Sequence, residues 1–319
     1  MNELNENSFY PQKPIFEEKK ESGNWIKTLL SMALFIGTFL LIFEEQLSFV
    51  LMLVLVLFVH ELGHFLLMKL FKYENVKMLF VPLMGAFVQG KKKQYSQFES
   101  LLVVGAGPFP GIILGVLFLF LFQINLDANY FLISILFFAL NLINLLPLDP
   151  LDGGQLFKLL LRKNSDLFLL IFSFTSSMIL ILLGLYLENW YLTIFGFFMG
   201  FRVRNMQRNY IIRNCLKQEN INYIKDYTDL TNQEYSQIKE VILENSKSLK
   251  KFKDMDEGDD ADRLVAQEVN SILVVPMQMN ASWWLKLLIL LFWIASFILP
   301  VYFITQIDSG VFDYGIFTK

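Results

Sequence analysis

Long apolar runs are the feature that most constrains this chain. Most of them approach the roughly 20 residues that a helix needs to cross a bilayer. The runs are 25–43, 48–71, 101–122, 130–147, 167–187, 190–203 and 283–306. Because the run at 190–203 is short, six spans are as tenable as seven. The pattern predicts an integral membrane protein.

The composition agrees with this expectation. Hydrophobic residues make up 55% of the 319 residues and charged residues only 18%, with a mean hydropathy of +0.46. An ordinary globular domain carries about a quarter charged residues, so a cytosolic enzyme and a disordered protein are excluded. The single cysteine, Cys215, cannot form an internal disulfide. A net charge of −3 gives no indication of a nucleic-acid partner.

Lysine and arginine alternate with uncharged or acidic connections along the chain. They flank the first run and follow the second, fourth and sixth, whereas the connections 44–47, 123–129 and 188–189 contain none. Positive charge marks the cytoplasmic side of a membrane protein. We therefore expect a multi-pass protein of the cell's inner or plasma membrane, with the N-terminus and the 204–282 segment in the cytoplasm.

These patterns divide the chain into five parts. They are a polar cytoplasmic N-terminus (1–24), a transmembrane core (25–203), a cytoplasmic helical segment (204–282), a C-terminal transmembrane helix (283–306) and a non-cytoplasmic tail (307–319). Apolar residues at spacings of three and four predict an amphipathic helix over 224–245. Thr231 and Glu234 have the spacing of a capping box, and the acidic run 254–262 predicts a solvated loop.

Both histidines of the chain lie in the second apolar run, in the sequence His60-Glu61-Leu62-Gly63-His64. Residues four apart lie on one face of a helix, so the two imidazoles can bind one ion. Glu61 lies close enough to reach a water on that ion, as in the His-Glu-x-x-His motif of zinc proteases. A chance match is the alternative. However, burying these groups in an apolar helix is costly without a partner, and a metal compensates that cost.

A zinc site needs a third protein ligand. No further histidine exists, so the ligand is a carboxylate or Cys215. The fourth apolar run ends in 144–154, where prolines and paired glycines end the helix and allow a turn. Asp152 lies in that turn and is the leading third ligand, although an aspartate there also suits a simple turn or helix cap. Cys215 lies in the cytoplasmic segment and is the poorer candidate.

Together, the motifs at 60–64 and 144–154 resemble the site-2 protease family, the intramembrane zinc metalloproteases of peptidase family M50. The resemblance covers about residues 25–203. The second motif of the family reads Asn-x-x-Pro-x-Pro-x-x-Asp-Gly. It is matched at Asn144, Pro147, Asp152 and Gly153. Asp149 stands where the family usually has its second proline, which makes Asp149 a weaker competitor for the metal.

The resemblance implies a fold and further site residues. The fold would be an all-α polytopic membrane protein of six to seven transmembrane helices, with a short re-entrant hairpin at 79–90 and a small helical cytoplasmic segment. Asn144 would hold the substrate backbone or polarise its carbonyl. The hairpin would capture the substrate as an extended strand. Gly85, Gly107 and Gly111 would contribute to substrate binding.

The implied activity is hydrolysis of peptide bonds within or near transmembrane segments. One Zn²⁺ per chain would be held by His60, His64 and Asp152, and Glu61 would take the proton of its bound water. The substrates would be membrane-spanning proteins or peptides, such as a membrane-held regulator or a signal-peptide remnant. The lipid bilayer is the surrounding partner, and the sequence leaves a homo-oligomer open.

Two other functions remain open on the residues alone. One is a membrane metallopeptidase of the prenyl-protein or quality-control type, which generally uses a downstream glutamate as third ligand. The other is a non-enzymatic metal transporter with an intramembrane His/Asp site. Cleavage of a peptide bond that depends on Glu61 separates both from the site-2 protease reading.

Overall fold

The structure is a computed structural model of the chain. It describes residues 10–15, 25–43, 46–82, 85–161, 166–245 and 259–307. The chain forms two compact units. The core unit contains Lys20–Lys92, Ser96–Arg162 and Met279–Lys319. The helical unit contains Met1–Lys19, Lys93–Tyr95 and Lys163–Gln278.

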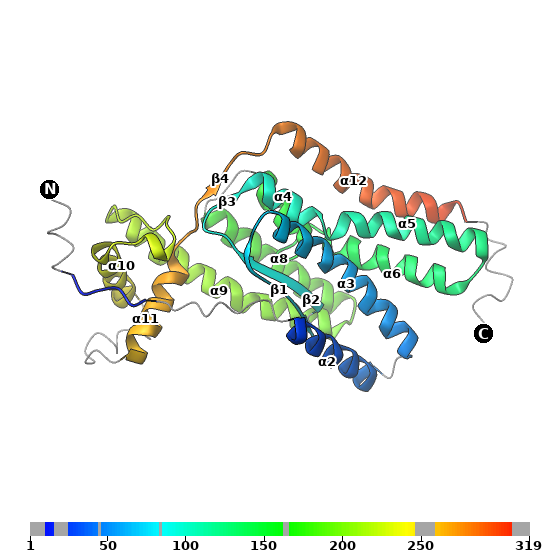
Figure 1. The fold of residues 1–319 in the computed structure, drawn as a ribbon, viewed down its shortest axis with the longest axis horizontal. Helices are drawn as coiled ribbons and strands as arrows, with labels where there is room; N and C mark the ends of the chain where they lie inside the picture. Colours follow the sequence, from blue (N-terminus) through cyan, green and yellow to red (C-terminus); the bar gives the residue numbers. More distant parts are fainter. Residues whose placement is uncertain are drawn as a thin grey trace. The chain divides into compact units, whose positions relative to one another are not determined.

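The core unit is mostly helical (Figure 1). Its helices are α2 (Trp25–Phe43), α3 (Leu47–Leu70), α4 (Gln97–Gly105), α5 (Pro108–Asn125), α6 (Ala128–Asn144), α7 (Asp152–Leu160) and α12 (Trp283–Thr305). Its hairpin consists of β1 (Glu74–Val81) and β2 (Gly85–Lys91). A second small sheet pairs β3 (Tyr95–Ser96) with β4 (Met277–Gln278).

Four helical stretches are long and apolar enough to cross a membrane: Leu47–Leu70, Gln97–Asn125, Asp166–Tyr186 and Trp283–Thr305. Two shorter apolar helices are Trp25–Leu41 and Ala128–Asn144. All six stretches coincide with apolar runs of the sequence, and the protein is a multi-pass membrane protein. The run at 101–122 is divided between α4 and α5. Pro108 starts α5, because its fixed φ suits the first position of a helix.

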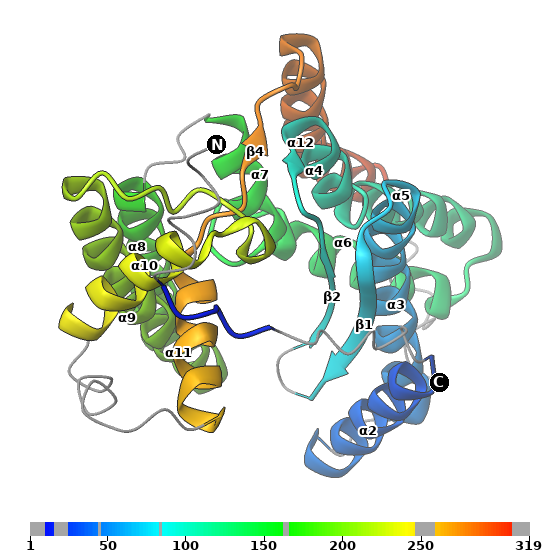
Figure 2. The same ribbon diagram turned by 60° about the vertical axis from the view of Figure 1, so that its left-hand side comes forward.

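The hairpin is the non-helical part of the core unit that matters most for the site. β1 and β2 pair antiparallel, with Met78 opposite Val88 and Val81 opposite Gly85. Alternate residues of β1 are buried, and the hairpin lies along α3 in both views (Figure 1, Figure 2). The sequence placed the hairpin at 79–90. It is longer, because the alternation of buried residues already begins near Glu74.

Side-chain packing holds α7 in place within the core unit. The wholly buried Leu156 of α7 packs in one apolar cluster with Leu101 of α4 and Leu145. The buried side chain of Gln97 donates a hydrogen bond from Nε2 to the Leu159 carbonyl at 2.6 Å. Trp293 of α12 donates from Nε1 to the Leu145 carbonyl at 2.8 Å. These contacts fix the N-terminus of α7, which matters for the site below.

The helical unit consists of α8 (Asp166–Tyr186), α9 (Trp190–Gln218), the 3₁₀ turn η1 (Tyr227–Asp229), α10 (Asn232–Asn245) and α11 (Asp259–Ile272). α8 and α9 pack against each other, and the Ser177 hydroxyl donates to the Gly196 carbonyl at 2.8 Å. α9 runs without a break through residue 203. The change in composition at 204 therefore falls inside a helix rather than at its end.

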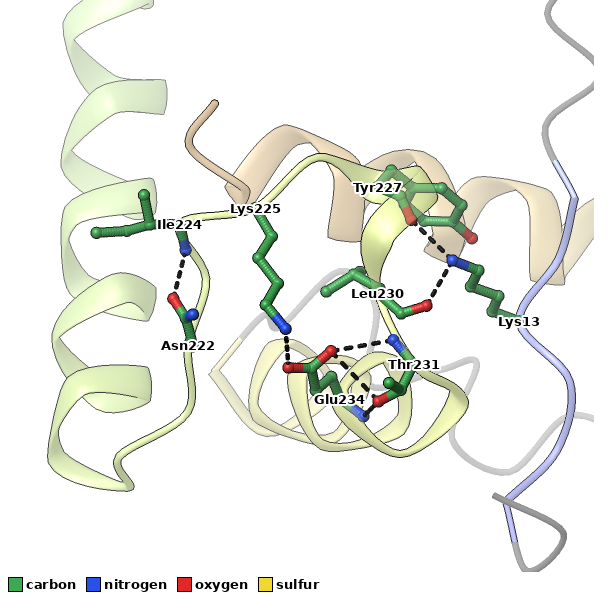
Figure 3. Close-up of polar contacts among 8 residues, drawn as sticks. All are labelled: Lys13, Asn222, Ile224, Lys225, Tyr227, Leu230, Thr231 and Glu234. Carbon is green, nitrogen blue, oxygen red and sulfur yellow. Dashed lines mark hydrogen bonds and ion pairs between the residues drawn. The ribbon is translucent and has the colours of Figure 1, made fainter. Parts of the chain in front are cut away.

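Two sequence expectations for this unit need correction. The helix expected over 224–245 begins only at Asn232, because the predicted capping box stops it there. Thr231 N donates to Glu234 Oε2 at 3.0 Å, and Glu234 N donates to Thr231 Oγ1 at 3.2 Å (Figure 3). The acidic run was expected to be a loop, yet α11 starts at Asp259. Residues 254–258 lie outside the described part of the chain.

An N-terminal segment, 10–15, is tied to η1 within the helical unit. Lys13 Nζ donates to the carbonyls of Tyr227, Thr228 and Leu230 at 2.9, 2.9 and 2.6 Å, and Figure 3 shows the first and last of these bonds. The Tyr227 hydroxyl donates to the Pro14 carbonyl at 2.9 Å. Burial raises the pKa of Tyr227 to about 12, so the hydroxyl keeps its proton at neutral pH.

Candidate metal centre

The two histidines meet on one face of α3, as their spacing predicts. His60 is 2% exposed and His64 is 8% exposed. Their Nε2 atoms lie 3.2 Å apart. Because two imidazole nitrogens with lone pairs gain nothing from facing each other, this approach indicates a shared ligand between them. Glu61, on the same turn, is 6% exposed.

Asp152 completes the cluster from a different part of the chain. It is the first residue of α7, where a negative charge is favoured by the helix dipole. Its Oδ2 lies 3.0 Å from His60 Nε2 and 3.3 Å from His64 Nε2. Among the residues that the structure describes, these three form the group of His, Cys, Asp or Glu side chains that could hold a metal ion. The third position proposed from the sequence is therefore in contact with the histidine pair.

The spacing of the three atoms fits a zinc ion. Zinc binds imidazole nitrogen and carboxylate oxygen at about 2.0–2.2 Å with tetrahedral geometry, which places neighbouring ligand atoms roughly 3.3 Å apart. The three separations here are 3.2, 3.0 and 3.3 Å. Two imidazoles and one carboxylate are also the donor set of a catalytic zinc site that keeps a fourth position open.

The other ring nitrogen of each histidine has a partner that fixes its tautomer. His64 Nδ1 lies 2.8 Å from the Val103 carbonyl, which can only accept, so Nδ1 carries the proton. His60 Nδ1 lies 2.7 Å from Asn141 Oδ1, while Asn141 Nδ2 donates to the Phe137 carbonyl at 2.7 Å. Both Nε2 atoms are thereby left with a lone pair for a metal, as in most histidine metal sites.

Asn141 therefore has a testable positioning role. We expect Asn141→Leu to lower metal affinity by about 10–100-fold, the usual effect of losing a partner of a ligating histidine. Metal affinity can be measured by competition with a chelator of known affinity. Asn144→Leu is the matched control, because Asn144 ends α6 and lies outside the metal cluster. Equal affinities for the two variants would contradict the role of Asn141.

Two of the glycines named from the sequence lie directly against this site. A Cβ on Gly107 would lie 2.3 Å from His64 Nε2, and one on Gly111 would lie 2.2 Å from Asn141 Nδ2. A side chain at either position would push the metal face or its supporting amide out of place. Close packing thus explains both glycines. Gly85, at the start of β2, has a positive φ of 94° and no neighbour against its Cβ position.

Glu61 lies between the metal face and the hairpin. Its carboxylate accepts a hydrogen bond from the backbone of Val88 in β2. β2 thus contacts the residue next to the metal ligands. The sequence had singled out the 79–90 region through resemblance, but no residue pattern indicated the contact with Glu61, because it is made by the backbone.

Three other sequence candidates lie apart from the metal cluster. Asp149 is 3% exposed and forms an ion pair with Lys158 of α7. Cys215 belongs to the helical unit, where its Sγ lies 3.8 Å from Asn245 Oδ1. Asn144 is half-buried at the end of α6. The sequence gave no sign of the Asp149–Lys158 pair or of the Val103 carbonyl beside His64.

Comparisons with known proteins agree on one family. Residues 48–126 match the model of peptidase family M50. The chain is 33% identical over 110 residues to a zinc metalloprotease of Methanocaldococcus jannaschii, covering 33% of this chain and 31% of that protein. It is 30% identical over 113 residues to stage IV sporulation protein FB of Bacillus subtilis, covering 35% of this chain and 39% of that protein.

The matched regions thus span about a third of the length of these curated relatives. A solved structure, the site-2 protease from Methanocaldococcus jannaschii, aligns with 57% of this chain and 88% of its own at 24% identity, with a TM-score of 0.41. The family match contains His60, Glu61 and His64, whereas Asp152 lies beyond it. On this match, and with a third metal-ligating side chain in contact with both histidines, the chain belongs to peptidase family M50.

Proposed function

We propose that this protein is an intramembrane zinc metallopeptidase that hydrolyses peptide bonds within or near the membrane-spanning segments of its substrates. One observation carries the proposal: His60, His64 and Asp152 converge beside the buried Glu61, within an apolar helix long enough to span a membrane. Ionisable groups at such a depth are costly and are retained for function. The relatives' title of zinc metalloprotease supports the same metal and reaction.

His60, His64 and Asp152 would hold the ion. When bound, zinc supplies a Lewis acid that polarises the scissile carbonyl and makes a water acidic near neutral pH. Glu61 takes a proton from that water as the water attacks the carbonyl carbon. Glu61 then gives the proton to the leaving nitrogen as the C–N bond breaks. The Val88 backbone contact holds the Glu61 carboxylate in place for both transfers.

The β1–β2 hairpin suits the presentation of substrate. A helical substrate offers no free amides, so its span must unwind before an attack on a peptide carbonyl. In the described part of the chain the hairpin's sheet has only two strands. An extended substrate can therefore add to an open edge by backbone hydrogen bonds. Because β2 contacts Glu61 through Val88, a strand added there would lie close to the general base.

Other site residues would act on the substrate. The Asn144 side chain, at the end of α6, would donate a hydrogen bond to the substrate carbonyl as negative charge develops on its oxygen. Gly85, Gly107 and Gly111 would border the bound strand. For Gly107 and Gly111 this comes in addition to the close packing described above.

The topology that accompanies this proposal has six or seven spans. The six apolar stretches noted above supply six, and the first half of α9, from Trp190, would supply a seventh. The alternation of basic connections supports a cytoplasmic N-terminus. It also supports a cytoplasmic segment over 204–282 and a non-cytoplasmic tail over 307–319, in the inner or plasma membrane. The hairpin would re-enter the membrane from the cytoplasmic side.

Substrate choice separates this function from its rivals. We expect the full chain, reconstituted with zinc in vesicles, to cut a single-pass membrane protein inside its span. It should leave a prenylated soluble peptide intact and should not move zinc to a dye trapped in the lumen. Mass spectrometry of the products locates the cut. Cleavage of the prenylated peptide alone would favour the quality-control type of enzyme, and zinc movement without cleavage would favour a transporter.

A further inference from the structure

A second cavity of the core unit has no part in the metal centre. It has a volume of about 510 Å³ and lies among α2, α3 and the hairpin. Four of its lining residues, Phe58, Leu62, Phe65 and Lys69, come from α3. Their spacings of four, three and four place them on one face of the helix. His60 and His64 follow Phe58 and Leu62 by two residues, a rotation of roughly 200°, so the metal lies on the opposite face.

The cavity has the length of one membrane leaflet. Phe58 and Lys69 are eleven residues apart, which corresponds to roughly 16 Å along an α-helix. The hydrocarbon core of a bilayer is about 30 Å thick, so half of it is about 15 Å. Lys69 lies in the last turn of α3, and the cavity extends from there toward the middle of the span. An occupant of this length would reach from the interface to the midplane.

The two ends of the cavity differ in chemistry. Lys27, Lys69 and Lys77 line it, and no acidic residue is among its described lining residues. Trp25 also lines it and is 69% exposed. Tryptophan and lysine at the end of a span are typical of the level of the lipid headgroups. The deeper wall is formed by apolar side chains such as Phe58 and Leu62.

We propose that this cavity binds one anionic phospholipid from the adjacent leaflet. The phosphate would lie among Lys27, Lys69 and Lys77, and an acyl chain would run along Leu62 to Phe58. Basic pockets between membrane helices recognise anionic headgroups in this way. A soluble phosphate would leave the apolar wall exposed, and a neutral lipid would leave the three lysines without a headgroup charge.

Such a lipid would brace the hairpin. The Thr28 hydroxyl donates to the Met78 carbonyl at 2.8 Å, and the Phe80 amide donates to Ser31 Oγ at 3.2 Å, so β1 is bound to α2. Thr28 and Met78 both line the cavity. An occupant would therefore touch α2, α3 and β1 together. The proposal concerns lipid binding and does not depend on the peptidase activity.

Native mass spectrometry of the full chain in detergent tests the proposal, with phosphatidylglycerol and phosphatidylcholine of equal chain length as probes. We expect one phosphatidylglycerol to bind at least about tenfold more tightly than phosphatidylcholine, since each lysine near a headgroup contributes to the attraction. The variant Lys27→Gln/Lys69→Gln/Lys77→Gln should lose this preference. Lys72→Gln, an exposed lysine outside the cavity lining, should keep it.

A second variant separates cavity binding from general surface attraction. Leu62→Trp fills the apolar wall and keeps all three lysines, so the tightly bound lipid should be lost. Retention of the preference in Leu62→Trp would overturn the proposal, because the lysines would then act as surface charge alone. Equal binding of the two lipids to the wild type would also overturn it. So would cross-linking of a membrane-spanning substrate to Phe58 that excess phosphatidylglycerol does not reduce.

Discussion

Glu61→Gln should retain zinc and lose at least about 10²–10⁴-fold of the rate of substrate cleavage, the contribution that a positioned proton acceptor makes. The substitution preserves the size of the side chain and its capacity to accept a hydrogen bond from the Val88 backbone. It removes only the basic carboxylate. Single-turnover cleavage of a membrane-spanning substrate in vesicles measures the chemical step, and metal analysis of the same sample measures zinc.

Substrate association should survive in this variant, so cross-linking should trap more enzyme–substrate complex than in the wild type. A matched control is Glu99→Gln. Glu99 is an acidic residue of the core unit that pairs with Lys92 and lies outside the metal cluster, so its cleavage rate should stay near that of the wild type. Near-normal cleavage by a zinc-loaded Glu61→Gln protein would reject Glu61 as the base.

Asp152→Ala should abolish stoichiometric zinc binding. The carboxylate lies 3.0 and 3.3 Å from the two Nε2 atoms, and without it the ion would keep only two protein ligands. The loss of affinity should exceed the about 10–100-fold that follows removal of a second-shell partner. Zinc per chain, measured on the purified protein after dialysis, gives the result directly.

Asp149→Asn is the control for Asp152, because Asp149 lies three residues earlier and forms an ion pair with Lys158. We expect this variant to hold one zinc per chain. Full zinc occupancy in Asp152→Ala, together with loss in Asp149→Asn, would transfer the third-ligand role to Asp149.

The metal cluster was largely predictable from the sequence because its signals are local. The spacing of His60 and His64 fixes a common helix face whatever the fold around it. Asp152 followed from the need for a third ligand and from a turn of prolines and glycines that ends a span. The apolar runs likewise located the six apolar stretches described above, since length and hydropathy suffice to identify a span.

The contacts that orient these groups were not predictable, because they join distant backbone atoms. His64 is held by the Val103 carbonyl, and Glu61 is contacted by the Val88 backbone. No side-chain pattern encodes either contact. The start of α10 was misplaced for a related reason. Helical spacing of apolar residues continued through η1, and the capping box at Thr231 had the stronger local effect.

Titration of zinc into the metal-free protein tests the central claim most directly. The purified full chain is stripped with a chelator, reconstituted in vesicles with a membrane-spanning substrate, and given zinc in steps while cleavage and bound metal are measured together. The account predicts no cleavage without metal, a rise in proportion to bound zinc, and a plateau at one zinc per chain. Cleavage that continues in the metal-free protein would contradict it, and so would a filled site that cuts no membrane-spanning substrate.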